Sequence, residues 1–148
     1  MVKEFDNLFI ERKDNFIPEL PFLEIKNKIL GAKYNLNIIF CSPVMSRDLN
    51  NRYRSKDYAT NILSFALADD QGEIYIQLAC ARSDAKKHNM SYNKFIHLLT
   101  IHGCLHLKHH QHGHKMDSLE DKYLKMFYTD IKVIKKNEAK GISKHNRD

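Results

Sequence analysis

Apolar residues recur along the chain with two periods, one typical of strands and one typical of helices. Alternating or β-rich runs predict strands over residues 5–12, 35–42, 61–67 and 73–78. The last two are separated by turn residues at 69–72 and predict a hairpin. Helical spacing predicts helices over residues 22–33, 46–54, 80–88 and 91–108, and one more after a loop at 109–115. The pattern indicates an α+β fold with about four strands.

Two of the predicted helices carry capping signals at their starts. Ser46 is the expected N-cap of the helix over residues 46–54. Asp117, followed three positions later by Glu120, matches a capping box for the last helix.

Composition adds limits to this picture. A length of 148 residues fits one domain, and a hydrophobic fraction of 43% is enough for one core. No run approaches the ~18 apolar residues of a membrane helix, and the first residues do not match a signal peptide, so we expect a cytoplasmic protein. Three widely spaced cysteines predict reduced thiols (Cys41, Cys80 and Cys104). The formal charge of +6 is compatible with a polyanionic partner.

The candidate chemistry lies in a histidine cluster. Seven of the nine histidines fall between residues 97 and 114. His102 and His106 are four apart on a predicted helix, so both rings project from one face. His112 follows six residues later, and a chain reversal after the helix would bring it to the same point. Three such ligands suit a zinc ion whose fourth position stays open, as catalysis requires.

The same spacing occurs in zinc proteases, which place a glutamate directly after the first histidine as general base. That position is Gly103 here, which argues against peptide hydrolysis. The surplus histidines leave another interpretation open, because a histidine-rich tract can also store metal or bind it adventitiously (His109, His110 and His114).

Three ordered blocks resemble a known family. The segment HGCLHL, followed by His112, is similar to the H-G-x-L-H-L-x-G-Y-D-H motif of the YbeY family of bacterial endoribonucleases. Residues 49–66, LNNRYRSKDYATNILSFA, resemble its L-N-x-x-Y-R-x-K-D-x-x-T-D-V-L-S-F-P block, and residues 72–78, GEIYIQL, resemble its G-D-I-x-I strand.

The resemblance implies an α+β domain with a mixed sheet over residues 1–136, followed by a flexible basic tail over 137–148. It implies a zinc-dependent, single-strand-specific endoribonuclease that matures the 3′ end of small-subunit rRNA and serves ribosome quality control. The implied partners are single-stranded RNA, rRNA and the small ribosomal subunit, with no membrane and no DNA. One Zn²⁺ per chain would be bound by His102, His106 and His112, and the implied catalytic residues are Arg54 and His102.

The chain departs from the family pattern in ways that leave the three ligands intact. His109-His110-Gln111 replaces Gly-Tyr-Asp before the third histidine. Glycine at the first of these positions lets the chain turn with positive φ, a conformation that histidine tolerates at some cost. Three further positions differ (Ser55 for Gly, Asn61 for Asp and Ala66 for Pro).

Two other functions remain open from the sequence. One is a zinc hydrolase of amides or small esters, which would not need Arg54. The other is a ribosome assembly factor without catalysis, in which a fourth side chain such as His110 or His114 would close a structural zinc site. Tyr53 or Tyr58 would stack on RNA bases or simply pack at the surface.

Overall fold

The computed structural model describes residues 1–13, 15–109 and 111–128. They form one five-stranded mixed sheet in the order β1-β2-β3-β5-β4. The three central strands, β2 (Leu8–Arg12), β3 (Asn35–Phe40) and β5 (Gln71–Ile76), are parallel. The two edge strands, β1 (Val2–Phe5) and β4 (Ile62–Ala68), pair antiparallel with their neighbours. The α+β class and the mixed sheet are therefore confirmed, with one strand more than predicted.

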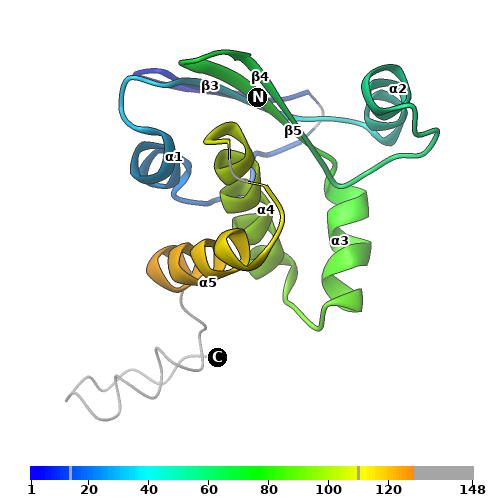
Figure 1. The fold of residues 1–148 in the computed structure, drawn as a ribbon. Coiled ribbons are helices and arrows are strands. Elements are labelled where there is room, and N and C mark those ends of the chain that lie inside the picture. Colours follow the sequence, from blue (N-terminus) through cyan, green and yellow to red (C-terminus); the bar gives the residue numbers. More distant parts are fainter. Residues whose placement is uncertain (14, 110, 129–148) are drawn as a thin grey trace.

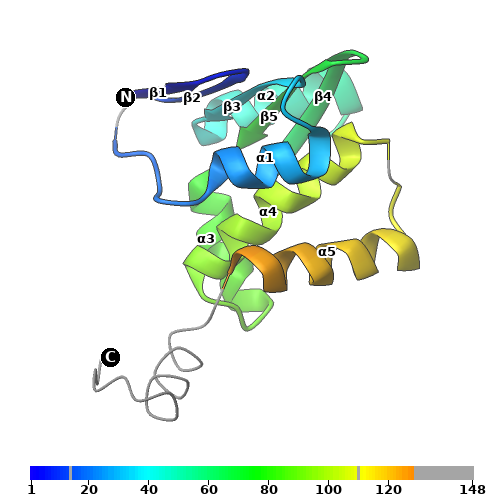
Figure 2. The same cartoon turned by 90° about the vertical axis from the view of Figure 1, so that its left-hand side faces the viewer.

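Helices cover one face of this sheet (Figures 1 and 2). Helices α1 (Phe22–Leu30), α3 (Leu78–Lys87) and α4 (Tyr92–Leu107) lie beneath the strands, and α5 (His114–Phe127) packs below α4. Helix α2 (Pro43–Arg54) lies apart from these, beside the sheet. Within the described residues, no helix is both long and apolar enough to cross a membrane.

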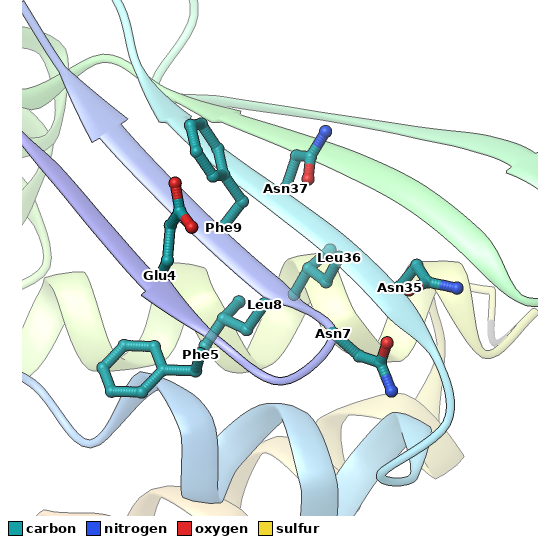
Figure 3. A pocket seen from close by; sticks show the side chains of 8 residues that line it. All are labelled: Glu4, Phe5, Asn7, Leu8, Phe9, Asn35, Leu36 and Asn37. Carbon is teal, nitrogen blue, oxygen red and sulfur yellow. The ribbon is translucent and has the colours of Figure 1, made fainter.

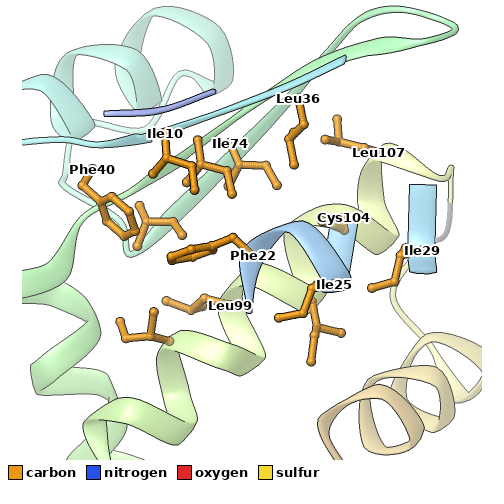
Figure 4. Packing of buried hydrophobic residues seen from close by; sticks show 14 of the residues in the cluster. Ile10, Phe22, Ile25, Ile29, Leu36, Phe40, Ile74, Leu99, Cys104 and Leu107 are labelled. Atoms are coloured by element: carbon orange, nitrogen blue, oxygen red, sulfur yellow. The ribbon is translucent and has the colours of Figure 1, made fainter. Parts of the chain in front are cut away.

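Helix α4 is the centre of the core. Ten of its 16 residues are buried, and they meet isoleucines from the sheet and side chains of α1 (Figure 4). Two glycines permit this close approach. A Cβ at Gly103 would lie 2.9 Å from Ile74 Cδ1, and one at Gly72 would lie 2.9 Å from Leu107 Cδ1. Larger residues at either position would push the helix away from the sheet.

The edge strand β4 separates α4 from α2. Side chains alternate between the faces of a strand. The Ser64 hydroxyl therefore lies 3.5 Å from the carbonyl of Gly103 on α4, whereas the ring of Phe65 faces the other way. Phe65 meets the ring of Tyr53 on α2 at a centroid distance of 5.2 Å. Two helices thus flank one strand from opposite faces.

The strand predicted over residues 5–12 is confirmed over Leu8–Arg12 as β2, but residues 5–7 are the end of β1 and a turn, so the segment is a hairpin. Its turn is Asp6-Asn7, and Asn7 adopts a left-handed conformation with φ 61°. Asparagine tolerates this conformation because its short side chain bonds locally. In this protein the side-chain amide of Asn7 instead donates to the carbonyl of Ala32, 25 residues away, at 3.0 Å. The extra strand supplies the fifth member of the sheet.

Two predicted helix starts are wrong. Helix α2 begins at Pro43, and its N-cap is Ser42, whose hydroxyl accepts from the Met45 amide at 3.1 Å. Ser46 is buried instead, and its hydroxyl bonds both the carbonyl and the amide of Thr60. Helix α5 begins at His114 after Gly113, without a side-chain cap.

Other boundaries differ less. Gly31, with φ 97°, follows the end of α1 at Leu30, three residues before the predicted end. The hairpin of β4 and β5 and the helices α3 and α4 confirm the predicted elements within a few residues. The expected basic tail over 137–148 lies outside the described residues.

Candidate metal centre

Helix α4 and the loop after it bring three histidines together. His102 and His106 lie one turn apart on α4, near its C-terminal end. The chain then reverses, since His109 has φ 70° and its amide donates to the carbonyl of His106 at 2.9 Å. This confirms that the position usually held by glycine needs positive φ. The reversal places His112 beside the other two rings.

The three rings form a compact group of nitrogen donors. The ring centroids are 4.5, 4.6 and 5.2 Å apart, and one ligand nitrogen from each residue lies within 4.8 Å of the others. The Nε2 atoms of His102 and His106 are 3.0 Å apart. Two nitrogens bound at 2.0–2.1 Å to a tetrahedral zinc ion are about 3.3 Å apart. The donor set therefore fits a zinc ion, with a small movement of the exposed His112.

Glu120 on α5 also belongs to this group. Its Oε2 atom accepts a hydrogen bond from Nδ1 of His102, and both side chains are largely buried. Sequence reasoning assigned Glu120 to a capping box and missed this contact. A signal was present, because Glu120 follows Met116 by one turn and therefore shares its face. Met116 is only 1% exposed, and a carboxylate on such a face needs a partner.

A cleft of about 520 Å³ connects the histidines with α2. Its lining includes His102, His106 and His112 on one side and Tyr53 and Arg54 on the other, with residues of β4 between them. The structure thus brings the predicted arginine and the predicted ligands to one cleft, although they are far apart in the sequence.

Arg54 differs from the other arginines of α2. Arg47 donates to both carboxylate oxygens of Asp57, and Arg52 pairs with Asp48 at 2.7 Å. In the part of the chain that the structure describes, no carboxylate pairs with Arg54. Arg54 itself lines the cleft.

Comparison with known proteins assigns the chain to a family. A family model described as Endoribonuclease YbeY matches residues 12–136. The chain belongs to this family. The Endoribonuclease YbeY of Phytoplasma mali is 36% identical over 125 residues, covering 78% of this chain and 80% of the relative. That of aster yellows witches'-broom phytoplasma is 30% identical over 144 residues, covering 91% and 86%.

A solved structure also matches the fold. The solution structure of a Thermotoga maritima protein superposes with a TM-score of 0.52 at 26% identity, covering 83% of this chain and 82% of the other. Membership of the YbeY family makes the chain a nuclease, a hydrolase whose substrates are RNA.

Two departures from the YbeY pattern fall on left-handed residues. Ser55, which replaces a glycine, ends α2 with φ 57° and ψ 36°. His109, which replaces another, has φ 70°. Both non-glycine residues adopt the conformation at some energetic cost. The loop after Ser55 is held by the Arg47–Asp57 pair, in which the Arg47 guanidinium lowers the pKa of the Asp57 carboxyl.

The remaining candidate ligands do not join the three histidines. Cys104 is fully buried, and this burial raises the pKa of its thiol to about 12. His114 is exposed at the start of α5, and among the described residues no fourth side chain completes the group. His110 lies outside the described residues. Gly103, packed against Ile74, leaves no room for the glutamate of a zinc protease.

A second hollow shares no lining residue with this cleft. It has about 210 Å³ and is formed by β1, β2 and β3 (Figure 3). Its lining includes one carboxylate, Glu4, and three asparagines, and it contains no histidine, cysteine or arginine. A single carboxylate with no second acidic, histidine or cysteine ligand among the lining residues does not form a metal site.

Proposed function

We propose that the protein is a zinc-dependent endoribonuclease that cuts single-stranded RNA in the cytoplasm. We further propose that it matures the 3′ end of small-subunit rRNA and serves ribosome quality control, with the small subunit as its partner. The observation that carries the nuclease proposal is the cleft shared by three histidines and an arginine that pairs with no carboxylate of the described residues. The ribosomal role is supported by the resemblance of three ordered sequence blocks.

The proposed ligands of the metal are His102, His106 and His112. Three imidazoles are a typical catalytic zinc set that leaves a fourth position for solvent or substrate. When bound, zinc supplies charge stabilisation at a phosphate oxygen and lowers the pKa of a water molecule. The protein's part is to fix the three rings, two of them on a helix buried in the core.

Arg54 is proposed to bind the phosphate group that is cut. The planar guanidinium can donate two parallel hydrogen bonds to phosphate oxygens, which a lysine cannot reproduce. The negative charge that develops during cleavage strengthens this contact. Arg54 is therefore proposed as a catalytic residue, together with the ligand His102.

Aromatic side chains support the preference for single strands. Tyr53 is 61% exposed at the cleft, and Tyr58 is 54% exposed in the following loop. Unpaired bases can stack on such rings, whereas bases in a duplex are already stacked. A paired RNA would lose this contact.

The experiment is cleavage of a labelled single-stranded RNA and of its duplex by the zinc-loaded protein. His106→Ala and Arg54→Lys are expected to lose most activity. Arg52→Lys is the matched control, because Arg52 lies on the same helix but is paired with Asp48. Cleavage of the single strand by wild type and by Arg52→Lys alone would support the proposal.

Other results would count against it. Equal cleavage by all four proteins would indicate a contaminating nuclease, and Arg54→Lys with wild-type activity would refute the role of Arg54. Zinc binding without cleavage of free RNA or of the small subunit would favour an assembly factor. The product ends show the nucleophile, because a 2′,3′-cyclic phosphate requires attack by the RNA 2′-hydroxyl.

A further inference from the structure

The contact between Glu120 and His102 joins α5 to the metal centre. Oε2 of Glu120 accepts from Nδ1 of His102, and the two side chains are 16% and 22% exposed. The nitrogen on the other side of the His102 ring, Nε2, lies 3.0 Å from Nε2 of His106. The His102 ring thus has the Glu120 carboxylate at its Nδ1 side and His106 at its Nε2 side.

This arrangement selects one form of the imidazole. An ionised carboxylate only accepts hydrogen bonds, so Nδ1 of His102 must carry the proton. The lone pair then resides on Nε2, which faces His106 and His112. The same hydrogen bond restricts rotation of the ring about its side-chain bonds. A ligand fixed in tautomer and direction binds a metal more tightly than one that must first be ordered.

The rest of α5 holds Glu120 in place. Met116, one turn before it, is buried against the core, and Tyr123 packs partly buried one turn after it. At the end of the helix, the Tyr128 hydroxyl lies 3.2 Å from the Ser91 hydroxyl, and its ring meets His97 at 5.0 Å. Packing and contacts on both sides therefore fix the carboxylate before any metal binds.

We propose that Glu120 is a positioning residue that holds His102 with Nε2 toward the metal and thereby sets the zinc affinity of the site. This inference rests on the proposed function only in taking the three histidines as zinc ligands. It adds a residue, contributed by a different helix, whose effect on zinc is indirect.

The test measures zinc affinity by competition with a chromophoric chelator. The proteins are wild type, Glu120→Gln, Glu120→Ala and the control Asp121→Asn, whose exposed carboxylate is the next residue on α5. Loss of an outer-shell carboxylate typically weakens metal binding about 10- to 100-fold. We expect Glu120→Ala to lie near the upper value and Glu120→Gln near the lower, since a glutamine oxygen still accepts from Nδ1. Asp121→Asn should bind as wild type does.

Thermal unfolding of the zinc-free proteins separates positioning from a general loss of structure. Glu120→Gln should retain the wild-type midpoint while its affinity falls, and its Co²⁺-loaded form should show an altered visible spectrum. Wild-type zinc affinity in Glu120→Gln and Glu120→Ala would overturn the inference, as would affinity losses that follow equal losses of zinc-free stability. If Glu120→Ala does not fold, Glu120→Gln decides the question.

The experiments distinguish a failure of the nuclease proposal from a failure of the proposed role of Glu120. Zinc affinities in the expected order support the role of Glu120 whether or not RNA is cut. A wild-type protein that binds no zinc overturns both.

Discussion

Replacement of Gly103 by alanine tests how closely α4 approaches the sheet. The new Cβ would lie 2.9 Å from Ile74 Cδ1, 3.2 Å from Ile74 Cγ2 and 3.0 Å from Ile62 Cδ1. Ile74 is completely buried in a central strand and cannot move aside easily. Alanine favours a helix by about 1 kcal/mol over glycine, but overpacking a core costs about 1–3 kcal/mol.

Overlap with three atoms places the overpacking cost in the upper part of this range, at about 2–3 kcal/mol. After the gain of about 1 kcal/mol in helix propensity, we expect Gly103→Ala to lower the free energy of unfolding by about 1–2 kcal/mol. This corresponds to a fall in Tm of roughly 2–8 °C for a domain of this size. Thermal and urea unfolding of the zinc-free protein measure it. An unchanged or raised stability would show that the helix does not lie this close to Ile74.

A second substitution sharpens the test. Ile74→Val removes Cδ1, the nearest atom, and alone should cost about 0.5–1.5 kcal/mol. In the Gly103→Ala background the same change relieves the overlap, so the double variant should be more stable than the sum of the single effects by about 1 kcal/mol. Additive effects would contradict the contact.

Three further predictions concern stability. Ser55→Gly should raise it by about 0.5–1 kcal/mol, because glycine adopts the left-handed conformation without strain; urea unfolding measures this, and a loss would contradict it. Burial lowers the pKa of His97 from its ordinary 6.5, so the unfolded chain gains a proton first as pH falls. The free energy of unfolding of the zinc-free protein should therefore fall by up to about 1.4 kcal/mol per pH unit below pH 6.5, until the pKa of His97 in the folded state is reached. His97→Gln should reduce that slope, and equal slopes would refute the assignment. Zinc at 100 times its Kd should stabilise wild type by about 2.7 kcal/mol and His106→Ala far less, which the Tm with and without zinc would test.

Much of the fold could be predicted because the pattern is strong where elements are long. The 16 residues of α4 and the hairpin of β4 and β5 follow the periodicity closely. The wrong predictions concern a turn and a helix N-cap, which depend on single residues. A two-residue turn at Asp6-Asn7 divides an apolar run, and Ser42 rather than Ser46 accepts the first amides of α2. Both serines precede helical residues, and only tertiary structure shows that Ser46 is bonded to Thr60.

The candidate site was predictable in part for the same reason. The spacing of His102 and His106 needs only a helix, and the positive φ of His109 follows from the turn before His112. The placement of Arg54 near them came from the resemblance, because no periodicity relates residue 54 to residue 102. Glu120 was missed because a carboxylate near a helix start has a simpler local explanation, whereas its partner is 18 residues away on another helix.

The strand order explains why these distant residues meet. Strand β4 is at the edge of the sheet, so the cleft can reach around it from one face to the other. One face holds α4, which is fixed by the core and by close packing at Gly103. Helix α2 lies beside the sheet and reaches the other face of β4 through Tyr53, which meets Phe65. Its buried Ser46 and Asn50 bond the backbone of Thr60 and Tyr58, and most of its remaining residues are exposed. Two of the three histidines thus stand on the most deeply buried helix of the described chain, a rigid element of the kind that suits a metal site. The arginine proposed to contact RNA stands on the helix that is least covered by the rest of the chain, where a large substrate can reach it.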